Sequence, residues 1–443
     1  MTSPLLIELR RGPGKALALT VAVVGALALA THSGPWLLYW NVFTFAGSSA
    51  MFLLVPIALG GGAMLGRRDG HTRAAELMGS TGRPLWQRML PGATALAAAV
   101  IGGHLLLLGT GAAVIAANGG ALAARGVLSV LVDTVLLAGA AWTGIAAGRA
   151  WPSRILPPAL ATLALVVQLA AEIEVTAGEP NPMRSLNLNG QPPGAHWEVL
   201  TDQALMGRLS LALGLLLAGA VFWLSRVGGV ALLVAGIAAT VAITPDTQPD
   251  RYRIDLAAQR LVCADGTPEV CVTAVHAHLL PSVTPQVRAA LERLGRLPDA
   301  PTRAVEWRAE KVATGDDLDH TGATPRIEPG TVAFRLDVDT RDTDPDLEAS
   351  ILAGAGTTAN GCEPRDLDAL WAAGAWLSGR DTLEVTDYVF GMLPADDSYR
   401  KILAELRKAT PEQQVRRVTA LRDAANRCEQ RDLTAILTGQ RAS

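Results

Sequence analysis

The chain has little charge, few aromatic residues and no cysteine before Cys263. Charged residues make up 18% and aromatic residues 5% of its 443 residues, whereas hydrophobic residues make up 50%. This composition excludes an ordinary soluble enzyme, because a water-exposed surface carries more charge. The sequence also lacks a His-Glu-x-x-His pair, a Gly-x-Ser-x-Gly elbow and a complete phosphate loop, since Ala16 stands where Ser or Thr would coordinate magnesium. A zinc peptidase or hydrolase of those types is therefore excluded, as is a nucleotide site within the chain.

Charge and cysteine divide the chain near Pro245. Up to this residue there are 14 Lys and Arg against 9 Asp and Glu, a net charge of +5; after it there are 24 against 32, a net charge of −8. All four cysteines lie in the acidic part, and an even number is typical of disulfides formed in an oxidising compartment. We therefore predict a transmembrane domain over residues 1–245 and an extracytoplasmic α+β domain with two disulfides over residues 246–443.

Long apolar runs in the first part predict an α-helical polytopic membrane protein with six or seven spans. The expected spans cover about 16–30, 47–65, 93–117, 126–148, 155–173 and 205–224, with a shorter seventh run at 230–244. A cleaved signal peptide is the alternative for the first run. Residues 32–48 are predicted to lie outside, with Trp36, Tyr39, Trp40 and Phe43 forming an aromatic belt at the membrane interface; the stretch either lies on the membrane or dips into it.

The loop from Arg67 to Pro91 gives the orientation of these spans. It holds five arginines, and short loops rich in Arg stay on the cytoplasmic side of a membrane. If residues 230–244 span, counting from this loop places everything after Pro245 outside the cytoplasm.

Several polar residues interrupt the apolar runs. His104, Asp133 and Gln168 are costly in lipid, so we expect them to face a protein interior or a water-filled path. They can contact substrate or form hydrogen bonds between helices. Arg208 is expected to snorkel outward, and Pro56 frees a carbonyl that another span or water must satisfy.

The acidic part is predicted to contain strands followed by helices. Strand-like runs are expected at 251–262 and 270–275, joined in a hairpin by residues 264–268, with further strands at 304–308 and 331–338. Helices are expected from Thr284, acting as a cap, to about Leu297 and at 347–355, 364–377, 397–408 and 411–427. Cys263 and Cys271 flank the hairpin turn and are predicted to pair, which leaves Cys362 to join Cys428.

Metal chemistry in this part has little support. His276 and His278 on one face of a strand are possible ligands, but the third ligand is missing and His320 is remote in the sequence. The acidic runs lack the spacing of a calcium loop. We therefore expect no metal and a solvated acidic surface.

Two stretches resemble parts of type-2 ABC transporters. The segment between the second and third runs resembles the cytoplasmic coupling segment of their permease subunits; the matching residues are Arg73, Glu76, Leu77, Met78, Ser80, Thr81, Arg83 and Trp86. The hairpin with its two cysteines and the final Arg-Cys pair resemble extracytoplasmic tails of actinobacterial membrane proteins of this permease type.

The resemblance implies the membrane subunit of an ATP-driven exporter in the cell membrane. ATP and magnesium would be bound by a separate ATPase subunit, so this chain is expected to be neither an enzyme nor the holder of a cofactor. A second permease subunit, identical or not, is the other expected partner, and no nucleic acid is expected. The alternatives are a membrane anchor or sensor whose outer domain binds a partner, and a membrane-tethered hydrolase, for which the tail offers no catalytic constellation.

Overall fold

The computed structural model divides the chain into two compact units, Met1–Arg253 and Ile254–Ser443. The division falls shortly after the predicted boundary at Pro245. The described residues are 14–31, 39–71, 85–120, 124–173, 185–188, 197–245, 248–309, 328–336, 347–358, 366–383 and 398–440.

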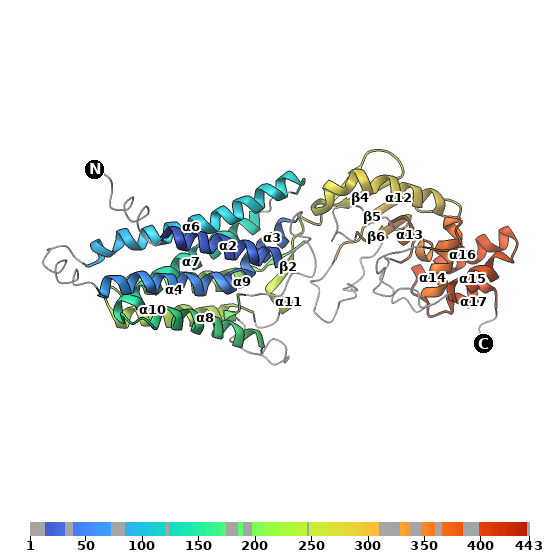
Figure 1. Ribbon diagram of the computed structural model, residues 1–443. Coiled ribbons are helices and arrows are strands. Elements are labelled where there is room, and N and C mark those ends of the chain that lie inside the picture. Colours follow the sequence, from blue (N-terminus) through green and yellow to red (C-terminus); the bar gives the residue numbers. More distant parts are fainter. Residues whose placement is uncertain are drawn as a thin grey trace. The chain divides into compact units, whose positions relative to one another are not determined.

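The first unit is a bundle of apolar helices (Figure 1). Its main helices are α2 (Gly14–Thr31), α3 (Trp40–Ser49), α4 (Met51–His71), α6 (Leu85–Ala117), α7 (Ala124–Ala150), α8 (Leu156–Ile173), α9 (Asp202–Val221) and α10 (Arg226–Ile243). By length and composition, α4, α6, α7, α9 and α10 each contain a candidate membrane span, and α2 and α8 are shorter apolar helices. The chain is thus mostly helical and fits a polytopic helical membrane protein.

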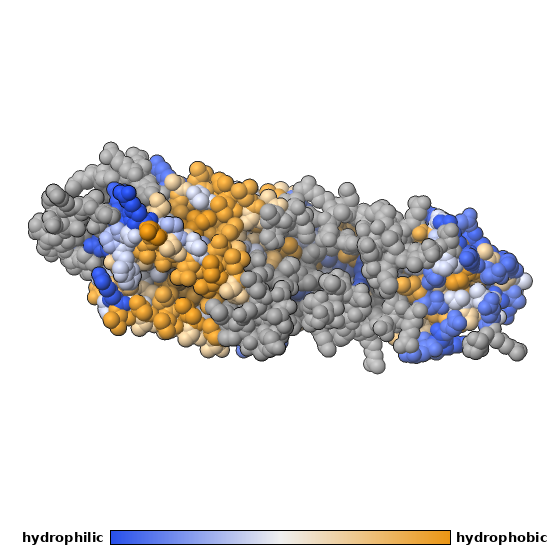
Figure 2. Space-filling view, turned by 60° about the horizontal axis from the view of Figure 1, so that its bottom comes forward, coloured by the Kyte–Doolittle hydropathy of each residue, from blue (hydrophilic) through white to orange (hydrophobic). Residues whose placement is uncertain are grey.

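The surface of this bundle agrees with a lipid environment. Large apolar side chains are exposed on α2, α6, α8, α9 and α10, among them Leu19, Leu106, Leu163, Leu217 and Val234. Figure 2 shows hydrophobic residues over much of the visible bundle surface, whereas hydrophilic residues predominate on the described surface of the C-terminal helices. Water does not favour such an apolar surface, but lipid tails do.

Helix α7 lies at the centre of the bundle and packs against α3, α4, α6, α8 and α9. Two matching small-residue motifs bring α7 close to α4. Gly62 and Gly66 of α4 lie against backbone atoms of Ala141 and Ile145, and Gly144 and Gly148 of α7 lie against those of Leu59 and Ala63. Glycine at every fourth position permits this approach because it leaves no Cβ between the helices.

Tyr39, Trp40 and Phe43 of the predicted interfacial belt are buried within the bundle, and Trp40 and Phe43 lie in a hydrophobic cluster with residues of α6. Their depth in the membrane stays a prediction. One prediction for the bundle is wrong. Arg208 does not snorkel outward, because its side chain is only 12% exposed and lies near Asp133.

The second unit contains a four-stranded sheet in the order β3 (Leu261–Ala264), β4 (Glu269–Thr273), β5 (Arg303–Glu306) and β6 (Thr331–Phe334). Strands β3 and β4 are antiparallel, whereas β4, β5 and β6 are parallel. Helix α12 (Leu280–Leu294) packs against β3, β4 and β5. The other helices are α13 (Leu347–Leu352), α14 (Leu367–Ser378), α15 (Ser398–Arg407), α16 (Pro411–Asn426) and α17 (Leu433–Thr438), with short 3₁₀ helices η4 (Ala274–Leu279) and η5 (Ala353–Ala355).

The predicted hairpin and its disulfide are confirmed. Cys263 lies opposite Cys271 in the β3–β4 register, and their sulfurs are bonded. Cys428 is also disulfide-bonded, while Cys362 lies outside the described residues. The run predicted as one strand over 251–262 is instead divided between β3 and the short strand β2 (Tyr252–Ile254), which pairs with β1 (Glu198–Leu200).

Two local predictions in this unit are wrong. Helix α12 begins at Leu280, with Pro281 in its first turn, and the Thr284 hydroxyl donates to the Leu280 carbonyl at 2.6 Å instead of capping the helix. Pro281 was the true start signal, because proline suits the first turn of a helix. His276 and His278 lie in η4 and not on a strand, since β4 ends at Thr273.

Candidate functional site

An ion pair lies inside the helical bundle. The Ser48 hydroxyl donates to Oδ2 of Asp133 at 2.6 Å, and Nη1 of Arg208 lies 3.7 Å from Oδ1 of the same carboxylate. Asp133 is 2% exposed. The three residues come from α3, α7 and α9, so one buried carboxylate links three helices. Buried charges inside a membrane bundle are costly and often mark functional positions.

Arg208 also lines an open recess in this unit. The recess contains about 480 Å³ of empty space, its mouth included, and its polar lining residues include Thr44, Ser48, Ser129, Glu198, Arg208 and Tyr252. Glu198 and Tyr252 reach it from β1 and β2, and the other four come from α3, α7 and α9. The recess therefore combines these polar groups with apolar lining residues such as Phe45 and Leu205.

The Tyr252 phenol keeps its proton in this setting. Burial raises the pKa of Tyr252 to about 12, and the opposing attraction of Arg208 and then Arg251 for the phenolate does not overcome it. The hydroxyl can therefore donate a hydrogen bond at neutral pH.

Gln168 has a structural role that explains its place in an apolar helix. Its Nε2 donates to the backbone carbonyl of Phe52 at 3.2 Å. Phe52 precedes Pro56 by four residues in α4, so its carbonyl has no N–H to accept from within the helix. Gln168 of α8 supplies the missing donor, as expected from Pro56, and holds α8 against α4.

Replacing Gln168 with leucine should cost about 1 kcal/mol, because the Phe52 carbonyl loses its donor inside the bundle. The same change in a Pro56→Ala background should cost clearly less, because the backbone N–H restored at position 56 can then bond to that carbonyl. Unfolding free energies of the four proteins in the cycle measure the difference. Equal costs in both backgrounds would show that Gln168 does not compensate for the backbone N–H that Pro56 lacks.

His104 lies on the buried face of α6. It is 1% exposed, and neither ring nitrogen has a hydrogen-bond partner in the described part of the chain. Leu96 and Val100, before it, belong to one hydrophobic cluster, and Leu107 and Leu108, after it, belong to another. His104 therefore separates two apolar clusters, and the structure assigns it no contact with the Asp133 pair.

Of the residues that resemble an ATPase-coupling segment, all but Trp86 lie outside the described part of the chain. Arg73, Glu76, Leu77, Met78, Ser80, Thr81 and Arg83 lie outside the described residues; Trp86 belongs to α6, which begins at Leu85.

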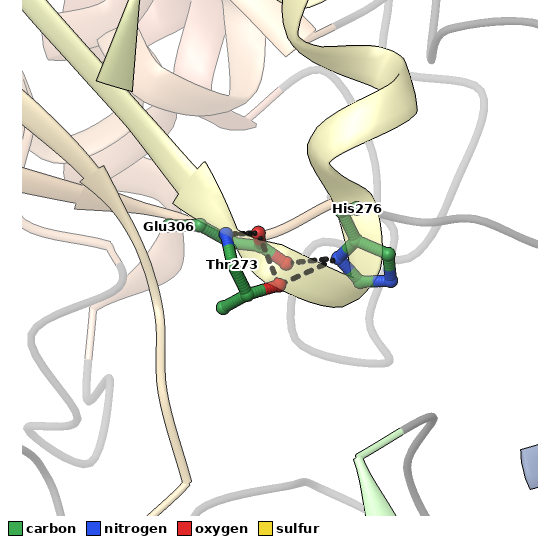
Figure 3. A network of polar contacts seen from close by, with 3 residues as sticks. All are labelled: Thr273, His276 and Glu306. Carbon is green, nitrogen blue, oxygen red and sulfur yellow. Dashed lines mark hydrogen bonds and ion pairs between the residues drawn. The ribbon is translucent and has the colours of Figure 1, made fainter. Parts of the chain in front are cut away.

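A second polar network is buried in the sheet-containing unit (Figure 3). Oε2 of Glu306 accepts from the Thr273 backbone N–H at 2.6 Å and from its hydroxyl at 2.8 Å, and Oε1 contacts Nδ1 of His276. The three residues are at most 2% exposed. The Thr273 hydroxyl and Oε1 of Glu306 both contact Nδ1 of His276. The three residues therefore do not form a triad, in which the acid and the nucleophile contact opposite nitrogens of the histidine. The network is a buried structural node between β4, η4 and β5.

Sequence reasoning missed Glu306, although a signal was present. Ala304 and Glu306 share the buried face of β5, so the alternation placed a carboxylate in the core. A buried carboxylate requires donors, and Thr273 and His276 supply them. His278 is near this node, and burial together with His276 holds its pKa below the usual value.

Replacing Glu306 with glutamine should destabilise this unit by about 1–3 kcal/mol, because an amide nitrogen must then face either Thr273 or His276. Urea unfolding of the full-length protein, with the susceptibility of this unit to proteolysis as the readout, measures the loss of unfolding free energy. Glu328→Gln is the matched control, since Glu328 pairs with Arg303 but is 77% exposed. A loss no larger than that of the control would contradict a buried node.

Among the described residues, one group has ligand atoms close enough for a metal ion: Cys263, Glu269 and Cys271. The two sulfurs are bonded to each other, so neither is a thiolate and the group is not a metal site. His320 lies outside the described residues, and no third ligand joins His276 and His278 in the part that is described.

Comparison with models of protein families, with curated proteins and with solved structures finds no match to this chain.

Proposed function

We propose that the chain is the membrane subunit of an ATP-driven ABC exporter. The observation that carries the proposal is the arginine-rich segment 67–91, which joins candidate spans in α4 and α6 and resembles the coupling segment of such permeases. ATP and magnesium would be bound by a separate ATPase subunit that docks on this segment. A second membrane subunit would complete the transporter.

The span order supports an extracytoplasmic tail. If residues 67–91 are cytoplasmic, and if the shorter apolar helix α8 crosses the membrane as do the candidate spans in α6, α7, α9 and α10, an odd number of crossings leads from that side to the tail and ends outside. The Cys263–Cys271 disulfide agrees with this side, because disulfides persist in oxidising compartments. The proposed location is therefore the cell membrane, with the acidic unit outside.

A pull-down from the native membrane tests the proposal. The detergent-solubilised protein is compared with a variant in which a neutral linker replaces residues 72–84, which leaves α6 intact. A variant with the equally long tail segment 310–322 replaced serves as the control. Recovery of an ATPase with the native and control proteins but not with the loop variant supports the proposal. If all three proteins are folded and none of them recovers an ATPase, the result favours the anchor or sensor hypothesis instead.

A single substitution tests the coupling residue. Glu76→Ala should lower ATP hydrolysis by the assembled complex severalfold while leaving the amount of folded membrane protein unchanged, because it removes a charge from the docking segment. Glu412→Ala, in the tail helix α16, is the control. Hydrolysis equal to that of the control would remove Glu76 from the mechanism.

A further inference from the structure

Two turns and a helix end lie together at one end of the bundle. Trp151, in the turn between α7 and α8, and Phe222, in the turn between α9 and α10, have ring centroids 6.1 Å apart, so the two turns are neighbours. The end of α4 joins them, because Gly66 lies against the backbone nitrogen of Arg149 near the end of α7. Figure 2 shows hydrophilic residues at one end of the bundle, next to the hydrophobic residues of its side.

Arginine dominates the charge of this surface. Residues 66–71, 149–155 and 222–226 together hold five arginines and one acidic residue. The arginines are Arg67, Arg68, Arg149, Arg154 and Arg226, and the acidic residue is Asp69. Arg154 and Arg226 are exposed, and neither side chain has an ion pair or a hydrogen bond in the described part of the chain. Both positive charges therefore remain for a partner.

Large apolar side chains lie beside these two arginines. The exposed fractions are 53% for Trp151, 74% for Ile155, 75% for Leu224 and 81% for Val227. Water does not favour so much exposed apolar surface, and a small soluble anion bound to the arginines would leave it uncovered. A ligand that joins a negative group to apolar chains matches both the charge and the apolar side chains.

The apolar part of this surface continues along α10. Val227, Val230 and Val234 are all exposed and follow one another at intervals of three and four residues, so they share one face of the helix. In a membrane, lipid chains cover this face. A lipid whose chains lie there has its headgroup level with the turn at which α10 begins, where Arg226 lies. This continuity favours a lipid over a soluble protein as the partner of the turn.

We propose that Arg154 and Arg226 bind the headgroup of an anionic lipid, whose chains lie against Trp151 and the exposed face of α10. Arginines close to a membrane surface attract anionic lipids, and aromatic side chains lie at the level of the headgroups. In the topology proposed above, this lipid belongs to the cytoplasmic leaflet. The site requires the bundle to lie in a membrane but requires no ATPase, so it can fail while the pull-down succeeds, or the reverse.

Lipid-dependent thermal stability of the full-length protein in an uncharged detergent tests the inference. Dihexanoyl-phosphatidylglycerol is the anionic probe, and dihexanoyl-phosphatidylcholine has the same chains without a net charge. The anionic lipid should raise the melting temperature with an apparent affinity at least about fivefold higher at low salt. The difference should shrink as sodium chloride is added, because salt screens exposed charges. Glycerol 3-phosphate, which has no chains, should bind far more weakly. Equal affinities for the two lipids, or for the anionic lipid and glycerol 3-phosphate, would overturn the proposal.

Substitution of the two exposed arginines assigns the preference to this surface. Arg154→Gln/Arg226→Gln should bind the anionic lipid about as weakly as phosphatidylcholine, with the affinity for phosphatidylcholine unchanged. Arg154→Lys/Arg226→Lys should keep most of the preference, because lysine retains both charges. An unchanged preference in the glutamine variant would overturn the proposal.

Arg125→Gln/Arg253→Gln is the matched control, since it also removes two positive charges from the first unit. Arg125 lies at the start of α7, at the opposite end of that helix from Arg149, and Arg253 pairs with Asp202. The control should bind both lipids like the native protein; an equal loss of preference would mean that net charge, and not this surface, selects the lipid. Loss of the ATPase from pull-downs of Arg154→Gln/Arg226→Gln, with an unchanged lipid preference, would assign the surface to the ATPase and also overturn the proposal.

Discussion

Asp133→Ala is expected to destabilise the bundle by about 3–5 kcal/mol, because it leaves the Arg208 guanidinium buried without its counter-charge. The distance of 3.7 Å to Oδ1 makes Asp133 the charge partner that the structure gives to Arg208. Unfolding of the full-length protein in bilayers, measured by steric trapping, gives the free-energy change directly.

A double-mutant cycle separates loss of the pair from loss of either residue. Arg208→Ala should also be strongly destabilising, whereas Asp133→Asn/Arg208→Gln should recover much of the loss, because no unpaired charge remains. Ser48→Ala should cost less, about 1 kcal/mol, since it removes one hydrogen bond to the carboxylate. A loss below about 1 kcal/mol for Asp133→Ala would mean that water reaches Arg208 and that the pair is not buried in solution.

The apolar runs of the sequence were sufficient to predict the helical, polytopic character of the first unit. A run of apolar residues in a membrane protein has few alternatives to a helix, because lipid supplies no hydrogen bonds to the backbone. The same reasoning correctly identified Asp133 and Gln168 as buried. It also predicted that the Phe52 carbonyl, freed by Pro56, needs a donor, but the donor comes from α8, far away in the sequence.

The sequence did not determine which residue each of these buried polar groups contacts. Arginine near a span end commonly snorkels, so the sequence favours an interfacial position for Arg208. Because burying a single charge in the membrane is unfavourable, an arginine and an aspartate in different spans can be predicted to form an ion pair. Several different pairings would meet this requirement. Only the packing of α7 against α9 selects this one.

The tail shows how tertiary contacts override local pattern. The run Val270–Val275 has strand residues throughout, yet β4 ends at Thr273, where the Glu306 side chain takes the backbone N–H, and η4 begins. Helix α17 was not predicted, because its six residues are too few for a clear period. The hairpin was predictable because its turn sequence and cysteine spacing act locally.

The glycines between α4 and α7 should be among the least replaceable residues of the chain. A Cβ on Gly144 would lie under 3.0 Å from the Leu59 carbonyl oxygen, and one on Gly148 equally close to that of Ala63. These contacts are with backbone, so relief requires the two helices to separate. Gly144→Ala/Gly148→Ala should therefore cost about 3 kcal/mol or more in unfolding free energy.

Gly102→Ala/Gly109→Ala on α6 is the matched control, since an added Cβ there meets no atom within 4 Å. This variant should be stabilised by about 0.5–1 kcal/mol per site, because alanine restricts the unfolded chain and favours the helix more than glycine does. The two double variants thus carry the same chemical change with opposite expected signs. If both are stabilised, α4 and α7 do not pack through their glycines, and the Asp133 site, which α7 positions, would have to be rebuilt from another helix arrangement.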